Sequence, residues 1–271
     1  MDSNAVIMTA GASVGFFKLV NTALKRLPVP ESACRNPWKW RNISTSLVHS
    51  LITGFWAVLW SVFQLYRLTV TQNVVAGLLS QWQWHNTLLV SYNFCVHPEM
   101  AEDLRSTHTV FSHALVSVSI GYFIYDFFDM FLNQKISQAW ELLFHHTVVV
   151  CCFGLSALTQ QFVGFSVVAL LVEINSVFLH LRQALRMAGL SGTMPYRLNR
   201  ALNLGTYVVF RISTLAWMTR WLVLNRSHIP LPSYTVGSLG LAIMTAMNIV
   251  LFCRLLRSDV LKVGSEGKRE K

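Results

Sequence analysis

Apolar stretches long enough to cross a membrane recur along this chain of 271 residues, and they constrain its fold more than any other feature. A helix of about 20 apolar residues spans the hydrocarbon core of a bilayer and satisfies its own backbone hydrogen bonds there. Hydrophobic residues make up 53% of the chain and charged residues only 13%. This composition is typical of a multi-pass membrane protein, so we predict an all-α transmembrane bundle of about seven spans.

The predicted spans are bounded by polar or charged residues that interrupt the apolar pattern. They cover residues 5–24, 43–63, 108–132, 140–159, 162–181, 203–224 and 233–253. The first begins shortly after Asp2 and has no basic region ahead of it, which argues against a cleaved secretory signal. We therefore expect a retained N-terminal anchor helix and a basic linker over residues 1–39.

Lysine and arginine gather in three places outside these spans. They occupy the linker after the first span, the linker after the fifth and the C-terminal tail: Lys25, Arg26, Arg35, Lys39 and Arg41; Arg182, Arg186, Arg197 and Arg200; Arg254, Arg257, Lys262, Lys268, Arg269 and Lys271. With seven spans, all three places lie on one side, which the positive-inside rule makes cytoplasmic. The N-terminus is then expected outside, and the polar tail at 258–271 in the cytoplasm.

The formal net charge of +10 would suggest a nucleic acid partner if the chain were soluble. Here the positive charge is confined to short stretches between apolar segments, without an RNA-binding signature or a sustained basic face. We interpret it as a signal of topology and of contact with anionic lipid head groups, and expect no nucleic acid partner.

The segment 64–107 does not fit the pattern of a span. It carries apolar residues but also many amides, which are costly in lipid, and a span here would move the arginine-rich linker at 182–200 to the outside. We predict an exterior loop that is partly interfacial through Trp82 and Trp84.

The five cysteines suggest neither a disulfide framework nor a metal site. Their number is odd, none forms a C-x-x-C pair, and no histidine follows at zinc-finger spacing. We expect no metal, and we expect Cys151 and Cys152 to be small apolar packing residues.

Ionisable residues lie within four consecutive predicted spans. Tyr122, Asp126 and Asp129 follow one another at i, i+4 and i+7, His145 and His146 are adjacent, Glu173 and His180 are seven apart, and Arg211 lies about 12 Å from the start of its span. Such groups are costly to keep in lipid without partners. We predict that they face one polar chamber in the cytoplasmic half of the bundle.

The candidate catalytic residues are His145, His146, Asp126 and Glu173. A histidine with a pKa near neutrality can accept a proton from a hydroxyl or an amine while a carboxylate orients its ring. The candidate lipid-binding residues are Tyr122, Asp129, His180 and Arg211.

Structural interpretations of the same residues remain open. The histidines can be satisfied core residues, and Glu173 and Arg211 can form a buried structural ion pair. Asp129 and His180 can lie at the membrane interface, and Tyr122 can be a packing residue.

The segment Gln138-Ala-Trp140-Glu141-Leu-Leu-Phe-His145-His146, preceded by Gly121-Tyr122-Phe-Ile-Tyr-Asp126 and followed by the predicted helix at 164–182, resembles the TLC domain. This family includes the ceramide synthases and the translocating-chain-associated membrane proteins. The resemblance covers residues 40–257, apart from 64–92, which has the character of an insertion.

Several further segments are similar to the subfamily of TLC domain-containing proteins 1 and 2. They are Asn36-Pro37-Trp38-Lys39-Trp40-Arg41-Asn42, with Ser44 and His49 after it, Leu170-Leu171-Val172-Glu173, and residues 179–182 and 255–259. This resemblance implies a multi-pass protein of the plasma membrane. It also implies a role in restricting phospholipids with polyunsaturated chains, which favours membrane rigidity.

The chain departs from the ceramide synthase pattern at one position. Those enzymes follow their histidine pair with two aspartates on the next helix, and the corresponding positions here are Glu173 and Ser176. The departure argues against N-acylation of a sphingoid base.

Three functions remain open from the sequence. The first is regulation of phospholipid acyl composition, with membrane phospholipids or acyl chains as ligands and another copy of the chain or lipid-remodelling enzymes as partners. The second is an acyl-CoA-dependent acyltransferase that uses His145 or His146 as base and Glu173 to orient it, with acyl-CoA as co-substrate and no other cofactor. The third is a translocation or channel-regulating partner.

The terminal Lys268-Arg269-Glu270-Lys271 resembles a dilysine signal and makes the endoplasmic reticulum the alternative location.

Overall fold

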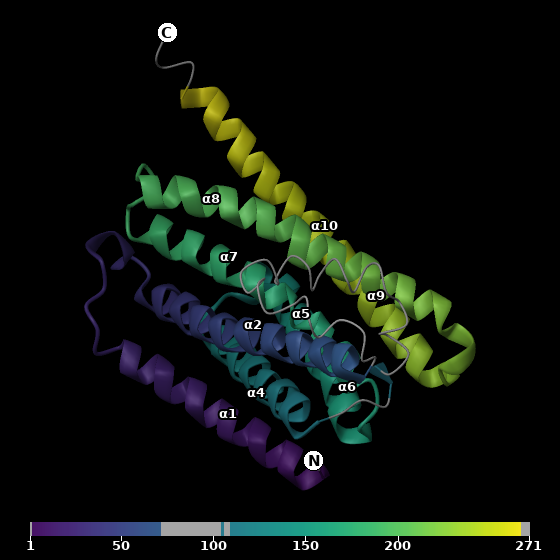
Figure 1. Cartoon of the computed structure of the whole chain (residues 1–271). Helices are drawn as coiled ribbons and strands as arrows, with labels where there is room; N and C mark the ends of the chain where they lie inside the picture. Colours follow the sequence, from purple (N-terminus) through teal and green to yellow (C-terminus); the bar gives the residue numbers. More distant parts are fainter. Residues whose placement is uncertain (1, 72–103, 106–108, 267–271) are drawn as a thin grey trace.

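The computed structural model describes residues 2–71, 104–105 and 109–266, and these form an all-helical bundle (Figure 1). The helices are α1 (Ser3–Leu24), α2 (Pro37–Thr71), α4 (Val110–Asn133), α5 (Ile136–Thr159), α6 (Val163–Ala169), α7 (Val172–Met187), α8 (Met194–Tyr207), η4 (Val208–Ile212), α9 (Ser213–Leu224) and α10 (Leu231–Glu266). Two short 3₁₀ turns, η1 (Glu31–Ala33) and η5 (Arg226–His228), lie between them. The predicted all-α class is therefore confirmed.

Six helical segments in the described part of the chain are long and apolar enough to cross a membrane. The predicted span at 203–224 is instead divided among α8, the π-helical η4 and α9, which follow one another without a loop. The predicted span at 162–181 is among the six, as Val163–Met187, although α6 ends at Ala169 and α7 begins at Val172 within it. The interruption at η4 contains the buried Arg211, and the one between α6 and α7 lies beside the buried Glu173.

The predicted loop does not begin at residue 64. Helix α2 continues to Thr71, so the first part of that segment is helical. An apolar stretch can extend as a helix beyond the residues that must lie in lipid, which the composition alone did not reveal. The rest of the predicted loop, including Trp82 and Trp84, lies outside the described residues.

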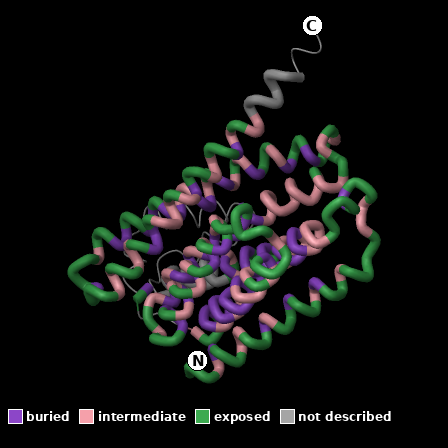
Figure 2. Tube along the Cα trace, turned by 180° about the vertical axis from the view of Figure 1, so that it is seen from behind, coloured by how far each residue is buried: buried purple, intermediate pink, exposed green. Residues whose placement is uncertain are grey.

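Helix α1 packs along α4 through small side chains. Ser13 Oγ donates a hydrogen bond to the carbonyl oxygen of Val118 at 2.6 Å, and Gly121 faces Ala10 and Ser13. Small residues allow two membrane helices to approach closely, so that packing replaces the hydrophobic driving force that lipid does not provide. Helix α1 is thereby part of the bundle, although its outer face is exposed (Figure 2).

We predict that Gly121→Ala weakens the contact between α1 and α4. An added Cβ would meet the carbonyl oxygen of Ala10 and lie 2.6 Å from Ser13 Cβ, so the helices would have to separate. The expected loss is about 1 to 3 kcal/mol of unfolding free energy, measured by thermal denaturation in detergent. Gly154→Ala on α5 is the matched control, because a Cβ there meets nothing within 4 Å. Equal stability of the two variants would contradict the packing described here.

Candidate functional site

Helix α2 presents a buried polar stripe to α4 and α7. Its members recur every three or four residues and are Asn42, Thr45, Ser46, His49, Ser50 and Thr53. The hydroxyls of Thr45, Ser46 and Thr53 donate to the carbonyl oxygens four residues earlier, so they need no water. Asn42, His49 and Ser50 remain to contact the neighbouring helices.

The carboxylates of α4 are held by donors from α2. Asn42 Nδ2 donates to Asp126 Oδ1 at 2.6 Å and to Asp129 Oδ2 at 3.2 Å, and Trp38 Nε1 donates to the same oxygen of Asp129 at 3.0 Å. His146 Nε2 lies 3.7 Å from Asp126 Oδ2, which is longer than a hydrogen bond. The sequence thus predicted the neighbourhood of Asp126 and His146, but their principal partner, Asn42, was missed.

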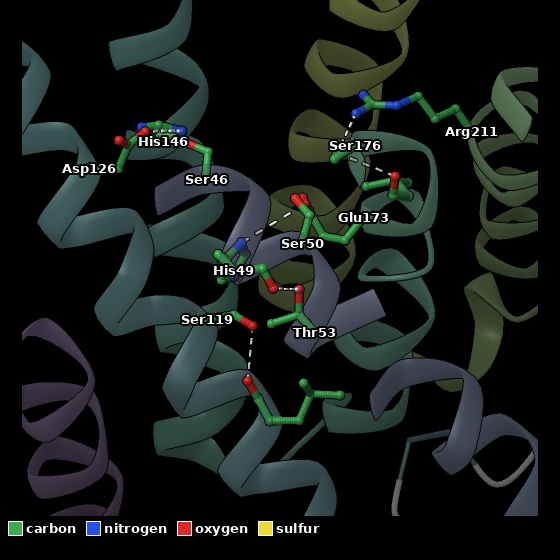
Figure 3. Close-up of polar contacts among 12 residues, drawn as sticks. Ser46, His49, Ser50, Thr53, Ser119, Asp126, His146, Glu173, Ser176 and Arg211 are labelled. Carbon is green, nitrogen blue, oxygen red and sulfur yellow. Dashed lines mark hydrogen bonds and ion pairs between the residues drawn. The ribbon is translucent and has the colours of Figure 1, made fainter. Parts of the chain in front are cut away.

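Glu173 on α7 faces the middle of the α2 stripe (Figure 3). Ser50 Oγ donates to Glu173 Oε2 at 2.7 Å, and His49 Nδ1 lies 3.9 Å from that oxygen. The ring of His49 stacks on Tyr122 with centroids 3.6 Å apart, and Phe17 of α1 packs edge-on against both. Tyr122 is therefore a packing partner of His49 in this structure.

Arg211 lies in the π-helical segment η4 and is directed into the bundle. Its Nε donates to Asn175 Oδ1 at 2.8 Å, its Nη1 to Asn248 Oδ1 at 2.8 Å, and its Nη2 to Ser176 Oγ at 2.7 Å. No ion pair of 4.0 Å or less joins Arg211 to Glu173 in the described structure, so the structural ion pair considered from the sequence is not formed. Three neutral acceptors satisfy the guanidinium instead.

These acceptors belong to a larger buried cluster, which we call the Arg211 network: Asn175, Ser176, Asn203, Tyr207, Arg211 and Asn248. Asn175 Nδ2 donates to the carbonyl and the side-chain oxygen of Asn203 at 2.9 and 3.0 Å. The Tyr207 hydroxyl donates to the carbonyl oxygen of Asn248 at 2.7 Å. The network therefore ties α7, α8, η4 and α10 together.

An apolar chamber of about 250 Å³ lies between α5, α6, α7, α9 and α10. His145 and Glu173 line its inner end, and from there it extends toward the turn between α5 and α6. Aromatic side chains, among them Phe153, Phe165 and Trp221, form much of its wall. The chamber therefore combines a long apolar wall with an imidazole and a carboxylate at one end, and hydroxyl and amide side chains such as Ser156 and Gln161 line it toward the turn.

The structure does not bring all the predicted side chains to this chamber. Only His145 and Glu173 of the eight candidates line it. His146 instead faces Asp126 and a smaller apolar groove of about 160 Å³ between α4 and α5. The prediction that all eight side chains face one polar chamber is therefore wrong, because two of them line the apolar chamber while Arg211 is held in a separate hydrogen-bonding network.

The remaining candidates have separate surroundings. Asp129 is held by Trp38 and Asn42, and Tyr122 is stacked on His49. His180 is partly exposed on α7, and like Arg211 it does not line the chamber. In the described part of the chain, no group of three or more His, Cys, Asp or Glu side chains is placed to hold a metal ion.

The residues that the sequence did not identify come mainly from α2 and from asparagines. Asn42, His49 and Ser50 supply three of the four polar contacts at the buried carboxylates of Asp126 and Glu173, and Asn175 and Asn248 hold Arg211. The helical spacing of the polar residues within the predicted span 43–63 was a signal that could have revealed the α2 stripe.

Apolar helices long enough to cross a membrane, packed around a buried polar centre, define a multi-pass membrane protein. The family model of the TLC domain matches residues 39–257, and the chain therefore belongs to the TLC domain family. The TLC domain-containing protein 2 of Danio rerio is 63% identical over 100% of this chain and 97% of its own length.

More distant relatives cover nearly the same part of the chain. The human TLC domain-containing protein 2 is 36% identical over 94% of this chain and 84% of its own length. The TLC domain-containing protein 1 of Gallus gallus is 30% identical over 95% of this chain and 91% of its own length. No solved structure matches the chain significantly.

We predict that Arg211→Met destabilises the bundle by about 2 to 3 kcal/mol, because the oxygens of Asn175, Ser176 and Asn248 lose a charged donor. Thermal unfolding in nanodiscs measures this loss. Arg254→Met is the control, because Arg254 is exposed and pairs with Glu141 at the surface. A comparable loss in the control would contradict the special role of the buried arginine.

We further predict that Ser176→Asp is tolerated only when Arg211 is present. A carboxylate at this position would lie beside the Arg211 guanidinium, which donates to Ser176 Oγ at 2.7 Å. In the Arg211→Met background the same carboxylate would be buried without a cation. A double-mutant cycle by thermal unfolding should give a coupling of at least about 1 kcal/mol, and additive effects would refute the prediction.

Proposed function

We propose that this protein regulates the acyl composition of membrane phospholipids, limiting polyunsaturated chains and favouring a more rigid plasma membrane. The observation that carries the proposal is the apolar chamber with His145 and Glu173 at its inner end. An acyl chain has the shape and polarity to occupy such a chamber, with its ester, amide or carboxyl group near the two polar side chains.

Discrimination between acyl chains has to come from shape, since lipid and chamber are both apolar. Transfer of a chain from the bilayer into the chamber releases little hydrophobic free energy, so packing against fixed walls decides affinity. Phe165 packs against Trp221 with ring centroids 5.2 Å apart, and both rings line the chamber. A rigid aromatic wall of this kind favours chains of one curvature over another.

The two polar groups at the inner end differ in how firmly they are held. Glu173 is buried and accepts a hydrogen bond from Ser50 at 2.7 Å. His145 is only partly buried, and its ring contacts Phe123 and His146. Glu173 can therefore hold a fixed position while His145 adjusts to the polar end of a bound lipid.

An acyl-CoA-dependent acyltransferase is the second candidate function. The favouring observation is that an imidazole and a carboxylate line the same chamber. His145 would accept the proton of an attacking hydroxyl or amine, and Glu173 would stabilise the imidazolium that forms. Acyl-CoA would be the co-substrate: the new acyl bond would form as its thioester C–S bond breaks, and the imidazolium would return the proton to the departing CoA thiolate.

We predict that Gly237→Leu abolishes the effect of the protein on phospholipids. Gly237 lines the chamber, and a Cβ there meets only Leu222 Cδ1 at 3.8 Å, so a larger side chain fills the space without displacing a helix. In cells that lack the native protein, lipidomics should show the same polyunsaturated phospholipid content whether or not this variant is expressed. Gly154→Leu on α5 is the control, because nothing lies within 4 Å of a Cβ there. Full activity of Gly237→Leu at equal expression would refute chain binding in the chamber.

We predict that the two adjacent histidines are not equivalent. His145 lines the chamber and His146 does not, so any acyl transfer by purified protein should fall about 100-fold or more in His145→Ala and much less in His146→Ala. The assay supplies acyl-CoA with amine or hydroxyl lipids as acceptors. Unchanged turnover in His145→Ala would remove its assigned role. Absence of turnover in the unmodified protein, with a lipidome that still responds to His145→Ala, would favour binding over catalysis.

A further inference from the structure

The chamber reaches the surface of the bundle between α5 and α10. Leu155 of α5 and Val236 of α10 both line the chamber, and they are 44% and 40% exposed. Thr159, at the end of α5, also lines it and is exposed. These residues belong to membrane-crossing segments, so the mouth of the chamber faces lipid rather than water.

The helices around the chamber also carry exposed apolar side chains that do not line it. Leu158, Val223 and Leu239 are 47%, 61% and 62% exposed, and they come from α5, α9 and α10. Leu155 lies four residues before the end of α5, which corresponds to a depth of about 6 Å from that helix end. The mouth is therefore at the level of one leaflet, on the side of the turn between α5 and α6.

Among the described residues, the hydrogen bonds and ion pairs between α10 and the rest of the bundle lie toward its C-terminal half. Asn248 accepts from Arg211 and Tyr207, Arg254 pairs with Glu141 at 2.7 Å, and Asp259 pairs with Arg182. In the described structure, the stretch 231–244, which forms the chamber wall, has no hydrogen bond or ion pair to another helix, and Ser238 Oγ is without a partner.

The chamber wall of α10 contacts α5 at a glycine. A Cβ on Gly240 would lie 2.8 Å from Cys152 Sγ and 3.9 Å from Val148 Cγ1, and it would meet nothing else within 4 Å. At this contact the side chain of Cys152 packs against the backbone of Gly240. We call this contact between α5 and α10 the seam. Such a contact lacks the interdigitated side chains that lock helices together.

The opposite end of the chamber is closed. Among the described residues, none from α8 or η4 lines it, and the last lining residue of α7 is Glu173. Immediately beyond lies the Arg211 network, in which Arg211 alone donates three hydrogen bonds. A water-soluble acyl carrier at the arginine-rich end would have to break this network to deliver its chain.

We infer that the chamber takes its ligand sideways from the bilayer: the acyl chain of a lipid already in the membrane passes through the seam between α5 and α10. This inference rests on the proposed function and identifies the class of ligand as a membrane-resident lipid. The chain remains in an apolar environment throughout, so its transfer needs only a displacement of the 231–244 stretch. The polar contacts from Asn248 onward act as the fixed end of that movement.

The seam can be locked by a disulfide that uses a native cysteine. Gly240→Cys would place its Cβ 2.8 Å from Cys152 Sγ, which is close to the separation found across a disulfide. The probe is a phosphatidylcholine with a diazirine on its acyl chain, incorporated into phosphatidylcholine nanodiscs that carry the whole chain. Oxidised Gly240→Cys should be photolabelled at least about tenfold less than the reduced form, because the open seam is no longer populated. Intact mass spectrometry confirms the crosslink.

Two further variants make the test independent of the disulfide. Gly240→Cys with Cys152→Ser cannot form the disulfide to Cys152, and its labelling should not respond to the oxidant. Val236→Trp places a large ring at the mouth and should reduce labelling, whereas Leu239→Trp, on the exposed face of α10 outside the chamber, should not. Equal labelling of Val236→Trp and Leu239→Trp would overturn the inference.

A second probe, a diazirine acyl-CoA added in solution, separates the two sources of an acyl chain. Labelling by phosphatidylcholine that is lost on locking and restored by reductant supports lateral loading. Labelling of the chamber by acyl-CoA alone, or equal labelling of the locked and open forms, overturns it and leaves the proposed function intact. Labelling of no form by either probe would instead count against the proposed function.

Discussion

A buried guanidinium without a carboxylate partner determines the organisation of this bundle. A charge inside a membrane protein must be satisfied from within the protein, since lipid offers no hydrogen bonds. Arg211 meets this requirement through Asn175, Ser176 and Asn248, which lie on two helices other than its own. Because each helix supplies part of one hydrogen-bonding arrangement, their relative positions are fixed at this depth. The π-helical turn at 208–212 accompanies the same arrangement, as such turns often do where a side chain must be redirected.

This polar centre divides the interior into two parts with different properties. On the side of α7 and α8, amide and hydroxyl groups fill the space between helices. On the side of the turn between α5 and α6, the walls are apolar and leave a chamber of about 250 Å³. His145 and Glu173 lie at the boundary, so a ligand in the chamber would meet an imidazole and a carboxylate at that end. The firm attachment of α10 beside Arg211 and the loose attachment of its 231–244 stretch at the chamber are both consequences of where the hydrogen bonds are placed.

The position where ceramide synthases carry a second aspartate has a local explanation here. Ser176 accepts a hydrogen bond from Arg211, so a neutral oxygen is sufficient as one of three acceptors. Glu173 retains a carboxylate but is engaged by Ser50 rather than by Arg211. The polar groups of this chain thus stabilise the bundle in one half, and among the eight candidate side chains only His145 and Glu173 line the chamber. This arrangement differs from a single site that contains every ionisable group.

The sequence by itself determined the helical class and the membrane character, because hydropathy and helical periodicity are local properties. It could not determine which side of each helix faces which neighbour. His145 and His146 are adjacent in sequence, yet successive residues point about 100° apart on a helix, and only the packing of α5 sends one to the chamber and the other toward α4. The partners of Arg211 and the empty space between α5 and α10 were likewise decided by tertiary structure, because both depend on contacts between residues far apart in the chain.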